Sequence, residues 1–287
     1  MLNEIVIKNL TISRIMLLLL SNQERESMKR RIYILGYINE QQFEKRKPIQ
    51  ARVSYFWLAM GYEVHVLDSV FTETEFYDFM PKDVIRHSNA KFKHICFARN
   101  FAIDHATSEG VDDFIAIADN DCTLRFMDDF GLDVVDLLNA MHKSDADVIF
   151  ASPPADFHSN FFKDNKQART HLLLHNQNNF KGSLLWVHTK TDHRFDTWFD
   201  EPRYGFAITP TEDNDFGLRG KRLGYKIRIA KQLKMHEHGG IKSSTWCPDT
   251  SIRTKHKPAD ERNDRACKKT WNKKYNQKYK TPDWIEI

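Results

Sequence analysis

The chain has 287 residues with a formal net charge of +4, and 41% of its residues are hydrophobic, which is enough apolar material for the core of one large α/β domain. Its four cysteines (Cys96, Cys122, Cys247 and Cys267) show no CxxC or zinc-ligand spacing. This argues against a cysteine-built metal framework, and we expect reduced thiols in a cytoplasmic protein.

The N-terminal segment contains one apolar run, at residues 15–20. The run is too short to span a bilayer, and no small-residue cleavage site of a signal peptide follows it. We therefore expect no membrane partner. Met28 precedes Lys-Arg-Arg and the first convincing strand pattern. We predict that Met28 is the natural start and that residues 1–27 are an artefactual extension.

Strand and helix patterns alternate through the first third of the chain. Apolar runs predict strands at 31–37 and 63–68, and helical spacing of apolar residues predicts a helix at 49–60 between them. This is a βαβ opening, for which a right-handed crossover is expected. A variable aromatic segment at 71–79 follows, and then a helix begins near Phe97.

Residues 114–118, Phe-Ile-Ala-Ile-Ala, predict a buried strand that leads directly into Asp119-Asn120-Asp121. Open α/β sheets bind ligands at the carboxyl ends of their strands. In an extended segment Asp119 and Asp121 point the same way, so both carboxylates can face one site. Hard oxygen ligands suit Mg²⁺ or Mn²⁺. The alternative is a plain strand-end turn, since Asp and Asn favour turns.

The later elements complete an α/β fold with a mostly parallel, Rossmann-like central sheet flanked by helices. They are a helix at 134–141, strands at 148–152, 181–187 and 225–230, a polar loop with a short helix at 156–179, a loop at 195–201 and a helix that opens at 212. We expect one catalytic domain at 28–248 and a basic tail at 249–287.

Two further groups of residues have chemical potential. Glu212, Asp213 and Asp215 follow a turn-prone Pro-Thr pair. Such acids often only cap a helix, but a general base for a hydroxyl nucleophile also needs a carboxylate at a site edge. His236 and His238 lie beside two glycines, and imidazole suits borderline metals such as Mn²⁺. Each histidine could equally be structural.

These motifs, in this order, resemble the GT-A class of nucleotide-sugar glycosyltransferases, especially its family-2-like branch, over residues 30–245. The matching segments are Ala98-Arg99-Asn100 opening a helix, Asp119-Asn120-Asp121 as the DxD motif, Phe195-Asp196 before the acceptor loop, Glu212-Asp213-Asn214-Asp215-Phe216 with Arg219 as the ED-x-DF-xx-R segment, and His238-Gly239-Gly240 with Ser243 or Ser244 as a late histidine turn.

The resemblance implies a metal-dependent transfer of a sugar from a nucleotide-diphosphate donor, with UDP-sugars as the expected donors and Mn²⁺ or Mg²⁺ as the cofactor. Asp121 would bind the metal, and Asp119 would reach the metal or the ribose. His238 or His236 would supply another ligand. The metal would neutralise the leaving diphosphate.

The resemblance also assigns the remaining roles. Asp213 would be the general base, with Glu212 as the other candidate, and the transfer would invert the anomeric carbon. The donor would further contact Asp68, which follows the second strand, and the residues of the two Arg-containing motifs. Those residues are Arg99, Asn100 and Arg219.

The acceptor region of the family is poorly matched, so the acceptor is inferred from the tail. Residues 251–280 carry 11 Lys/Arg and 3 Asp/Glu, interleaved with aromatic residues. Basic residues bind phosphates and aromatic rings stack on bases. The expected DNA-binding residues include Lys268, Lys269, Trp271, Lys273 and Lys274.

The composition also resembles that of bacteriophage proteins. We therefore predict a DNA glycosyltransferase that adds glucose, arabinose or a similar sugar to 5-hydroxymethylcytosine in phage DNA, within the host cytoplasm. Base flipping would expose the acceptor.

Three alternatives remain open from the sequence. The acceptor could be a saccharide or a protein. The chain could be a nucleotidyltransferase, but the segment after the first strand has a single glycine, Gly36, where a Gly-rich phosphate loop is usual. It could also be a DNA-binding module without activity, for which the acids at 119, 121, 212 and 213 would have no purpose.

Overall fold

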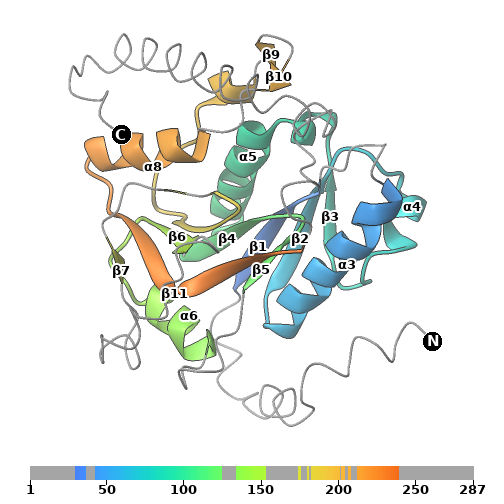
Figure 1. The fold of residues 1–287 in the computed structure, drawn as a ribbon, viewed down its shortest axis with the longest axis horizontal. Helices are drawn as coiled ribbons and strands as arrows, with labels where there is room; N and C mark the ends of the chain where they lie inside the picture. Colours follow the sequence, from blue (N-terminus) through green and yellow to red (C-terminus); the bar gives the residue numbers. More distant parts are fainter. Residues whose placement is uncertain are drawn as a thin grey trace, which may run out of the picture.

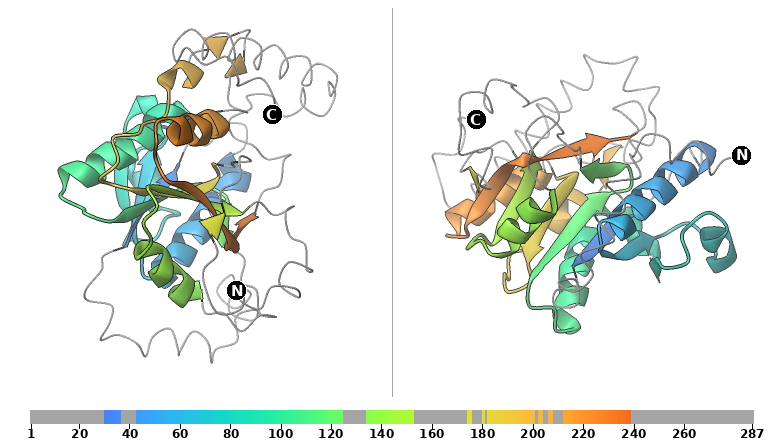
Figure 2. Two further views of the ribbon diagram at one scale, coloured as in Figure 1. Left: turned by 90° about the vertical axis from the view of Figure 1, so that its left-hand side faces the viewer. Right: turned by 90° about the horizontal axis from the view of Figure 1, so that it is seen from below.

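The computed structural model describes residues 30–36, 43–124, 134–152, 174–175, 180, 182–200, 202–203, 206–207 and 212–238. Within them lies a nine-stranded sheet with the order β3-β2-β1-β4-β8-β6-β11-β5, and β7 pairs with β11. Helices cover both faces of this sheet (Figures 1 and 2). The predicted α/β class is therefore confirmed.

The first half of the sheet is parallel and corresponds to the predicted βαβ opening. Strand β1 (Arg31–Leu35) lies between β2 (Glu63–Asp68) and β4 (Phe114–Asp119), and β3 (Ile85–Ser88) pairs with β2. The register aligns Leu35 with both Leu67 and Asp119. The carboxyl ends of these strands therefore form one edge, at which the first acid of the Asp pair stands.

The second half of the sheet is mixed. Strand β8 (Leu184–His188) runs antiparallel between β4 and β6 (Val148–Ser152), and β6 is parallel to the long β11 (Ile227–Glu237). Strands β5 (Cys122–Leu124) and β7 (Leu174–His175) pair with β11. A separate two-stranded ribbon joins β9 (Pro202–Arg203) and β10 (Phe206–Ala207).

Two apolar cores lie on the two faces of the sheet. One packs β1, β2 and β4 against α3 (Phe43–Ala59) and α6 (Val134–His142). The other packs the opposite side chains of these strands against α5 (Ile95–Ser108) and α8 (Glu212–Arg222). Figure 2 shows α5 and α8 on one side of the sheet and α3 and α6 on the other. Strand residues alternate between the two cores, as the pleat requires.

Several boundaries differ from the sequence prediction. Helix α3 begins at Phe43, although Pro48 lies inside it and removes one helical hydrogen bond. The aromatic segment contains α4 (Glu73–Tyr77), which begins with a capping box between Thr72 and Glu75. Short 3₁₀ turns at Ala90–Lys93 and Thr197–Asp200 complete the described elements.

Within the described residues, no helix is both long and apolar enough to cross a membrane. Cys96 and Cys122 are buried, and neither forms a disulfide within the described residues. The segments 1–27 and 249–287, with Lys268, Lys269, Trp271, Lys273 and Lys274, lie outside the described residues. The proposed start site, the domain limits and the DNA-binding residues therefore stay predictions.

Candidate active site at the carboxyl edge of the sheet

The Asp pair stands where β4 ends and β5 begins. Asp119 is the last residue of β4, and its backbone N–H donates to the Ser183 carbonyl at 2.8 Å. Two residues later, the Asp121 carbonyl accepts the backbone N–H of His238 at 2.8 Å. Neighbouring strands thus fix the backbone on both sides of the pair. Both acids therefore stand at the carboxyl end of β4, next to its junction with β5.

Arg99 connects this pair to the acids of α8. The side chain is buried, and Nη1 lies 3.1 Å from Glu212 Oε1. Nη2 donates to the Gly182 carbonyl at 2.9 Å and lies 3.6 Å from Asp119 Oδ1. One guanidinium therefore holds carboxylates from β4 and α8 in one cluster. This is the juxtaposition that the two sequence motifs predict.

Asp213 is fixed beside Arg99 by a close approach of the backbone. Its Oδ2 accepts the Gly182 N–H at 2.8 Å. A Cβ atom at Gly182 would lie 2.9 Å from Asp213 Cβ and 3.0 Å from Arg99 Nη2, so only glycine fits here without displacement. Asp213 is partly buried, whereas Glu212 is buried. Asp213 is therefore the more accessible of the two candidate bases.

A second buried arginine, which the sequence analysis missed, holds Asp121. Arg46 Nη1 lies 2.8 Å from Asp121 Oδ2 and 3.4 Å from Asn120 Oδ1. Arg46 lies outside the helix predicted at 49–60, but α3 begins earlier and includes it. With Gln50 and Ser54 it forms a buried polar stripe at one-turn intervals. This spacing was the available signal.

The two predicted histidines differ in their surroundings. His238 Nε2 lies 2.9 Å from Thr123 Oγ1, and its backbone is bound to Asp121. Burial, with smaller contributions from His236 and Arg52, lowers the pKa of His238 to about 4. The ring is therefore neutral at pH 7. His236 was expected after the strand at 225–230, but it lies within β11 and is exposed.

The buried carboxyl groups are shifted away from their ordinary titration. Burial raises the pKa of Asp119 to about 6; Arg99 opposes this and Asp121 adds to it. Burial and the neighbouring Asp213 raise the pKa of Glu212 to about 8, again against Arg99. Negative charge is thus crowded at this edge, and an added cation would relieve it.

The donor atoms at this edge are of the kinds that bind a divalent cation, although Asp119, Asp121 and His238 do not converge as one ligand group among the described residues. Asp121 uses Oδ2 for Arg46, and no hydrogen bond or ion pair to its other oxygen is seen within the described residues. Asp119 Oδ1 is buried and has no hydrogen-bond partner in the same part of the chain. His238 supplies a neutral ring beside Asp121. Two carboxylate oxygens and one imidazole form a suitable donor set for Mn²⁺, and the carboxylates suit Mg²⁺.

Asp68 stands at the carboxyl end of β2, but its oxygens have other partners. Oδ1 accepts the backbone N–H groups of Val70 and Phe71, and Oδ2 pairs with Arg86 at 2.8 Å. The side chain is fully buried. It fixes the segment after β2, and its role in binding the donor base stays a prediction.

Asn100 and Arg219 are also engaged in supporting contacts. The Asn100 amide exchanges two hydrogen bonds with the Phe195 backbone, at 2.8 and 2.9 Å. Arg219 pairs with Asp215 at 3.0 Å and donates to the Arg194 carbonyl at 2.7 Å. Both side chains hold the segment after β8 against α5 and α8. Donor contact by either residue stays a prediction.

Three further contributors were not predicted. Gly182 is the contact point between Arg99 and Asp213. The Ser183 hydroxyl lies 3.3 Å from Glu237, and both residues influence the pKa of Asp119. A lone glycine or serine in a strand pattern carries no signal. Glu237 was hidden because the sequence suggested that the strand ended before it.

No protein-family model and no curated protein matches the sequence. Similar solved structures include a Desulfovibrio desulfuricans G20 protein assigned as a nucleotide-diphospho-sugar transferase, with 7% identity and a TM-score of 0.44 over 73% of this chain and 82% of that chain.

A Bacillus anthracis protein assigned as a glucose-1-phosphate thymidylyltransferase has 8% identity and a TM-score of 0.45, over 75% of this chain and 91% of that chain. The inositol-1-phosphate CTP transferase from T. maritima has 9% identity and a TM-score of 0.42, over 73% of this chain and 89% of that chain. These likenesses are too weak to indicate a function, so a function has to be argued from the residues of this chain.

Proposed function

We propose that the chain is a metal-dependent glycosyltransferase that moves a sugar from a nucleotide-diphosphate donor to a hydroxyl acceptor with inversion. One observation carries the proposal. Asp119, which shares the β4–β5 junction with Asp121, meets Glu212 and Asp213 around Arg99 and Gly182 at the carboxyl edge of the sheet. A cation-binding pair of acids beside a separate, accessible carboxylate is the donor set that this reaction requires.

Asp213 is the proposed general base. As the acceptor oxygen bonds to the anomeric carbon and the bond to the diphosphate oxygen breaks, Asp213 takes the hydroxyl proton. The Gly182 N–H donates to one Asp213 oxygen and so orients the carboxylate. Glu212 is buried against Arg99, and its raised pKa keeps it largely protonated at neutral pH. Glu212 is therefore a positioning residue in this proposal.

Asp121, Asp119 and His238 would hold Mn²⁺ or Mg²⁺, which when bound would supply Lewis-acid stabilisation of the leaving diphosphate. Arg46 orients the Asp121 carboxylate, and Arg99 orients Asp119. Because both arginines are buried, they keep the two acids in place before any ligand arrives. UDP-sugars are the proposed donors.

The proposed acceptor is 5-hydroxymethylcytosine in phage DNA, and its support is the sequence of the basic tail. A saccharide or protein acceptor is the alternative. In either case the enzyme acts on an acceptor hydroxyl, so the chemistry at Asp213 is the same. The acceptor and the reaction at the edge can therefore be tested separately.

The test is incubation of the full chain with a panel of nucleotide sugars and Mn²⁺, with hydroxymethylated DNA, unmodified DNA, simple saccharides or no acceptor. Nucleoside diphosphate and pyrophosphate are both measured. We expect nucleoside diphosphate release that depends on metal and is stimulated by hydroxymethylated DNA.

Each alternative has its own result. Stimulation by saccharides alone would remove the DNA acceptor and keep the transferase. Release of pyrophosphate from nucleoside triphosphate and sugar phosphate would support a nucleotidyltransferase. No turnover of any donor would refute the proposal.

A further inference from the structure

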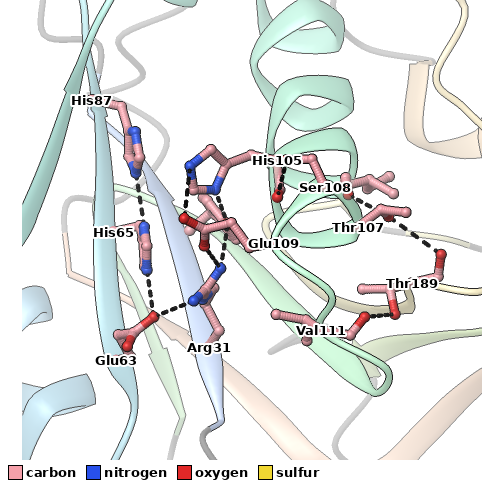
Figure 3. Close-up of polar contacts among 12 residues, drawn as sticks. Arg31, Glu63, His65, His87, His105, Thr107, Ser108, Glu109, Val111 and Thr189 are labelled. Atoms are coloured by element: carbon pink, nitrogen blue, oxygen red, sulfur yellow. Dashed lines mark hydrogen bonds and ion pairs between the residues drawn. The ribbon is translucent and has the colours of Figure 1, made fainter.

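A cluster of three histidines lies on the α5 face of the parallel half of the sheet, and it shares no residue with the site above. His65 comes from β2, His87 from β3 and His105 from the last turn of α5. Each offers a ring nitrogen, and the three nitrogens lie within 4.8 Å of one another. Figure 3 shows the three rings converging between the strands and the helix.

Strand register brings these distant residues together. Tyr33 on β1 pairs with His65 on β2, and Leu67 pairs with His87 on β3. Residues 65 and 67 share one face of β2, so His65 and Leu67 both face α5. His87 lies beside Leu67 on the neighbouring strand. His105 on α5 closes the group, with Tyr33 OH 2.8 Å from its Nδ1. Three rigid elements therefore hold the rings.

The nitrogen of His65 that faces His87 is set up as an electron-pair donor. His65 Nε2 lies 2.8 Å from Glu63 Oε1, so this nitrogen carries the proton. Nδ1 is then left with its lone pair, and it lies 2.8 Å from His87 Nε2. A carboxylate that fixes the tautomer of a histidine in this way is typical of metal-binding histidines.

His87 and His105 can adopt the tautomers that a metal needs. In the contact above His87 Nε2 carries the proton, and moving that proton to Nδ1 frees Nε2 without any change of charge. The Tyr33 hydroxyl can donate or accept, so it is compatible with either neutral tautomer of His105. Both rings are partly exposed, which leaves room for this adjustment and for a water molecule.

The charges around the rings favour a cation. Glu63 and Glu109 both pair with the single Arg31, which leaves one negative charge in excess. A bound divalent cation would balance this excess.

The distances suit a transition metal after a small movement. Tetrahedral Zn²⁺ with Zn–N bonds of ~2.0–2.1 Å places its nitrogen ligands about 3.3 Å apart. The present nitrogens range from 2.8 Å, between His65 and His87, to a maximum of 4.8 Å across the group. A purely structural hydrogen-bonded cluster is the alternative, and it predicts no metal affinity.

We propose that His65, His87 and His105 form a second metal site that binds Zn²⁺, with water at the fourth position. The metal would join β2, β3 and α5, which together support Arg99 and the segment after β2. This site would prefer Zn²⁺, whereas the carboxylates at the sheet edge prefer Mn²⁺ or Mg²⁺. The two sites can therefore be separated by metal type and by mutation.

The experiment measures binding of Zn²⁺, and of Co²⁺ as a spectroscopic probe, to the chelator-treated full chain. We compare the wild type with His87→Gln/His105→Gln, with Asp121→Asn and with His188→Gln as a matched histidine control on β8. We expect one Zn²⁺ equivalent in the wild type, in Asp121→Asn and in His188→Gln. Affinity in the double variant should fall at least 100-fold, and that in Glu63→Gln by about 10- to 100-fold.

Unchanged Zn²⁺ and Co²⁺ binding in the double variant would overturn the proposal. So would a wild type that binds neither ion, or a loss of Zn²⁺ in Asp121→Asn equal to that in the double variant. If the double variant does not fold, the single variant His105→Gln, at a partly exposed position, is tested in its place. A Co²⁺ spectrum typical of four nitrogen and oxygen ligands, weakened in His105→Gln, supports the site, and an unchanged spectrum refutes it.

Discussion

The carboxyl edge of the sheet and the histidine cluster use the same scaffold with opposite chemistry. At the edge, two buried arginines, Arg46 and Arg99, hold the carboxylates of Asp121 and Asp119. In the cluster, two acids and one arginine surround three imidazole rings. Helix α5 contributes to both, through Arg99 and His105. Buried charges therefore distinguish the proposed catalytic region. In the proposed zinc site, the distinguishing feature is a carboxylate that fixes which nitrogen of His65 carries the proton.

The largest expected difference concerns activity. Asp213→Asn keeps the shape of the side chain but removes the proposed base, so kcat should fall about 10²- to 10⁴-fold. Glu109→Gln, which removes an acid from the cluster, should change kcat less than about twofold. The activity of both variants is measured as nucleoside diphosphate release. Asp136→Asn, at an exposed position on α6, is the control. Equal losses in Asp213→Asn and Glu109→Gln would remove the functional distinction between the two regions.

The next difference concerns the two arginines that hold the acids. Arg99 is 1% exposed between Glu212 and Asp119, so Arg99→Met should lower the free energy of unfolding by ~3–5 kcal/mol. Arg31 lies nearer the surface beside the 45%-exposed Glu109, and Arg31→Met should cost about 1 kcal/mol. Urea unfolding gives both values.

A rescue experiment sharpens this prediction about Arg99. Adding Asp119→Asn to Arg99→Met removes the carboxylate that loses its cationic partner and should recover part of the lost stability. If the two arginine variants are equally stable, or if the double variant is no better than Arg99→Met, the buried ion pair is not what holds the edge.

Backbone packing at the edge should produce a smaller effect. Gly182→Ala would place a methyl group 2.9 Å from Asp213 Cβ and 3.0 Å from Arg99 Nη2. The displacement should cost ~1–3 kcal/mol of stability and lower kcat more than KM changes. Gly61→Ala is the control for adding a methyl group, because nothing lies within 4 Å of its Cβ position, although its φ of +79° adds backbone strain. Full activity in Gly182→Ala would contradict the close approach.

The last predicted effect is on the dependence of stability on pH. The folded state raises the pKa of Glu212 to about 8 from an ordinary value of 4.5. Its contribution is fully present below pH 4.5 and is lost as pH rises through about 8. Between pH 6 and pH 9 the wild type should therefore lose about 2–3 kcal/mol that Glu212→Gln does not lose. Parallel unfolding curves for the two proteins across this range would refute the shift.

Much of the fold could be predicted because local sequence patterns dominate it. The bounds of β2 follow directly from Glu-Val-His-Val-Leu-Asp, and the apolar run before Asp119 marks β4. The start of α3 was missed because Pro48 and several charged residues hide the helical pattern. Strand β3 was missed because its four residues are too short and polar to show alternation.

The candidate sites divide in the same way. Asp119, Asp121, Glu212 and Asp213 were found because they occur in local groups. Arg46 and Gly182 were missed because their role arises only when α3 and β8 pack at the edge. The three histidines lie on separate elements, and each is isolated in the sequence. Strand register and the packing of α5 bring them together, and a single sequence gives neither.

The central claim is that the sheet edge binds a nucleoside diphosphate through a cation held by Asp121. Titration calorimetry of UDP and other nucleoside diphosphates, with and without Mn²⁺, tests it in the wild type, Asp121→Asn and Asp136→Asn. We predict saturable binding that requires Mn²⁺, weakens at least tenfold in Asp121→Asn and is unchanged in Asp136→Asn. Binding that ignores Mn²⁺ and Asp121, or no binding of any nucleoside diphosphate, would contradict the account.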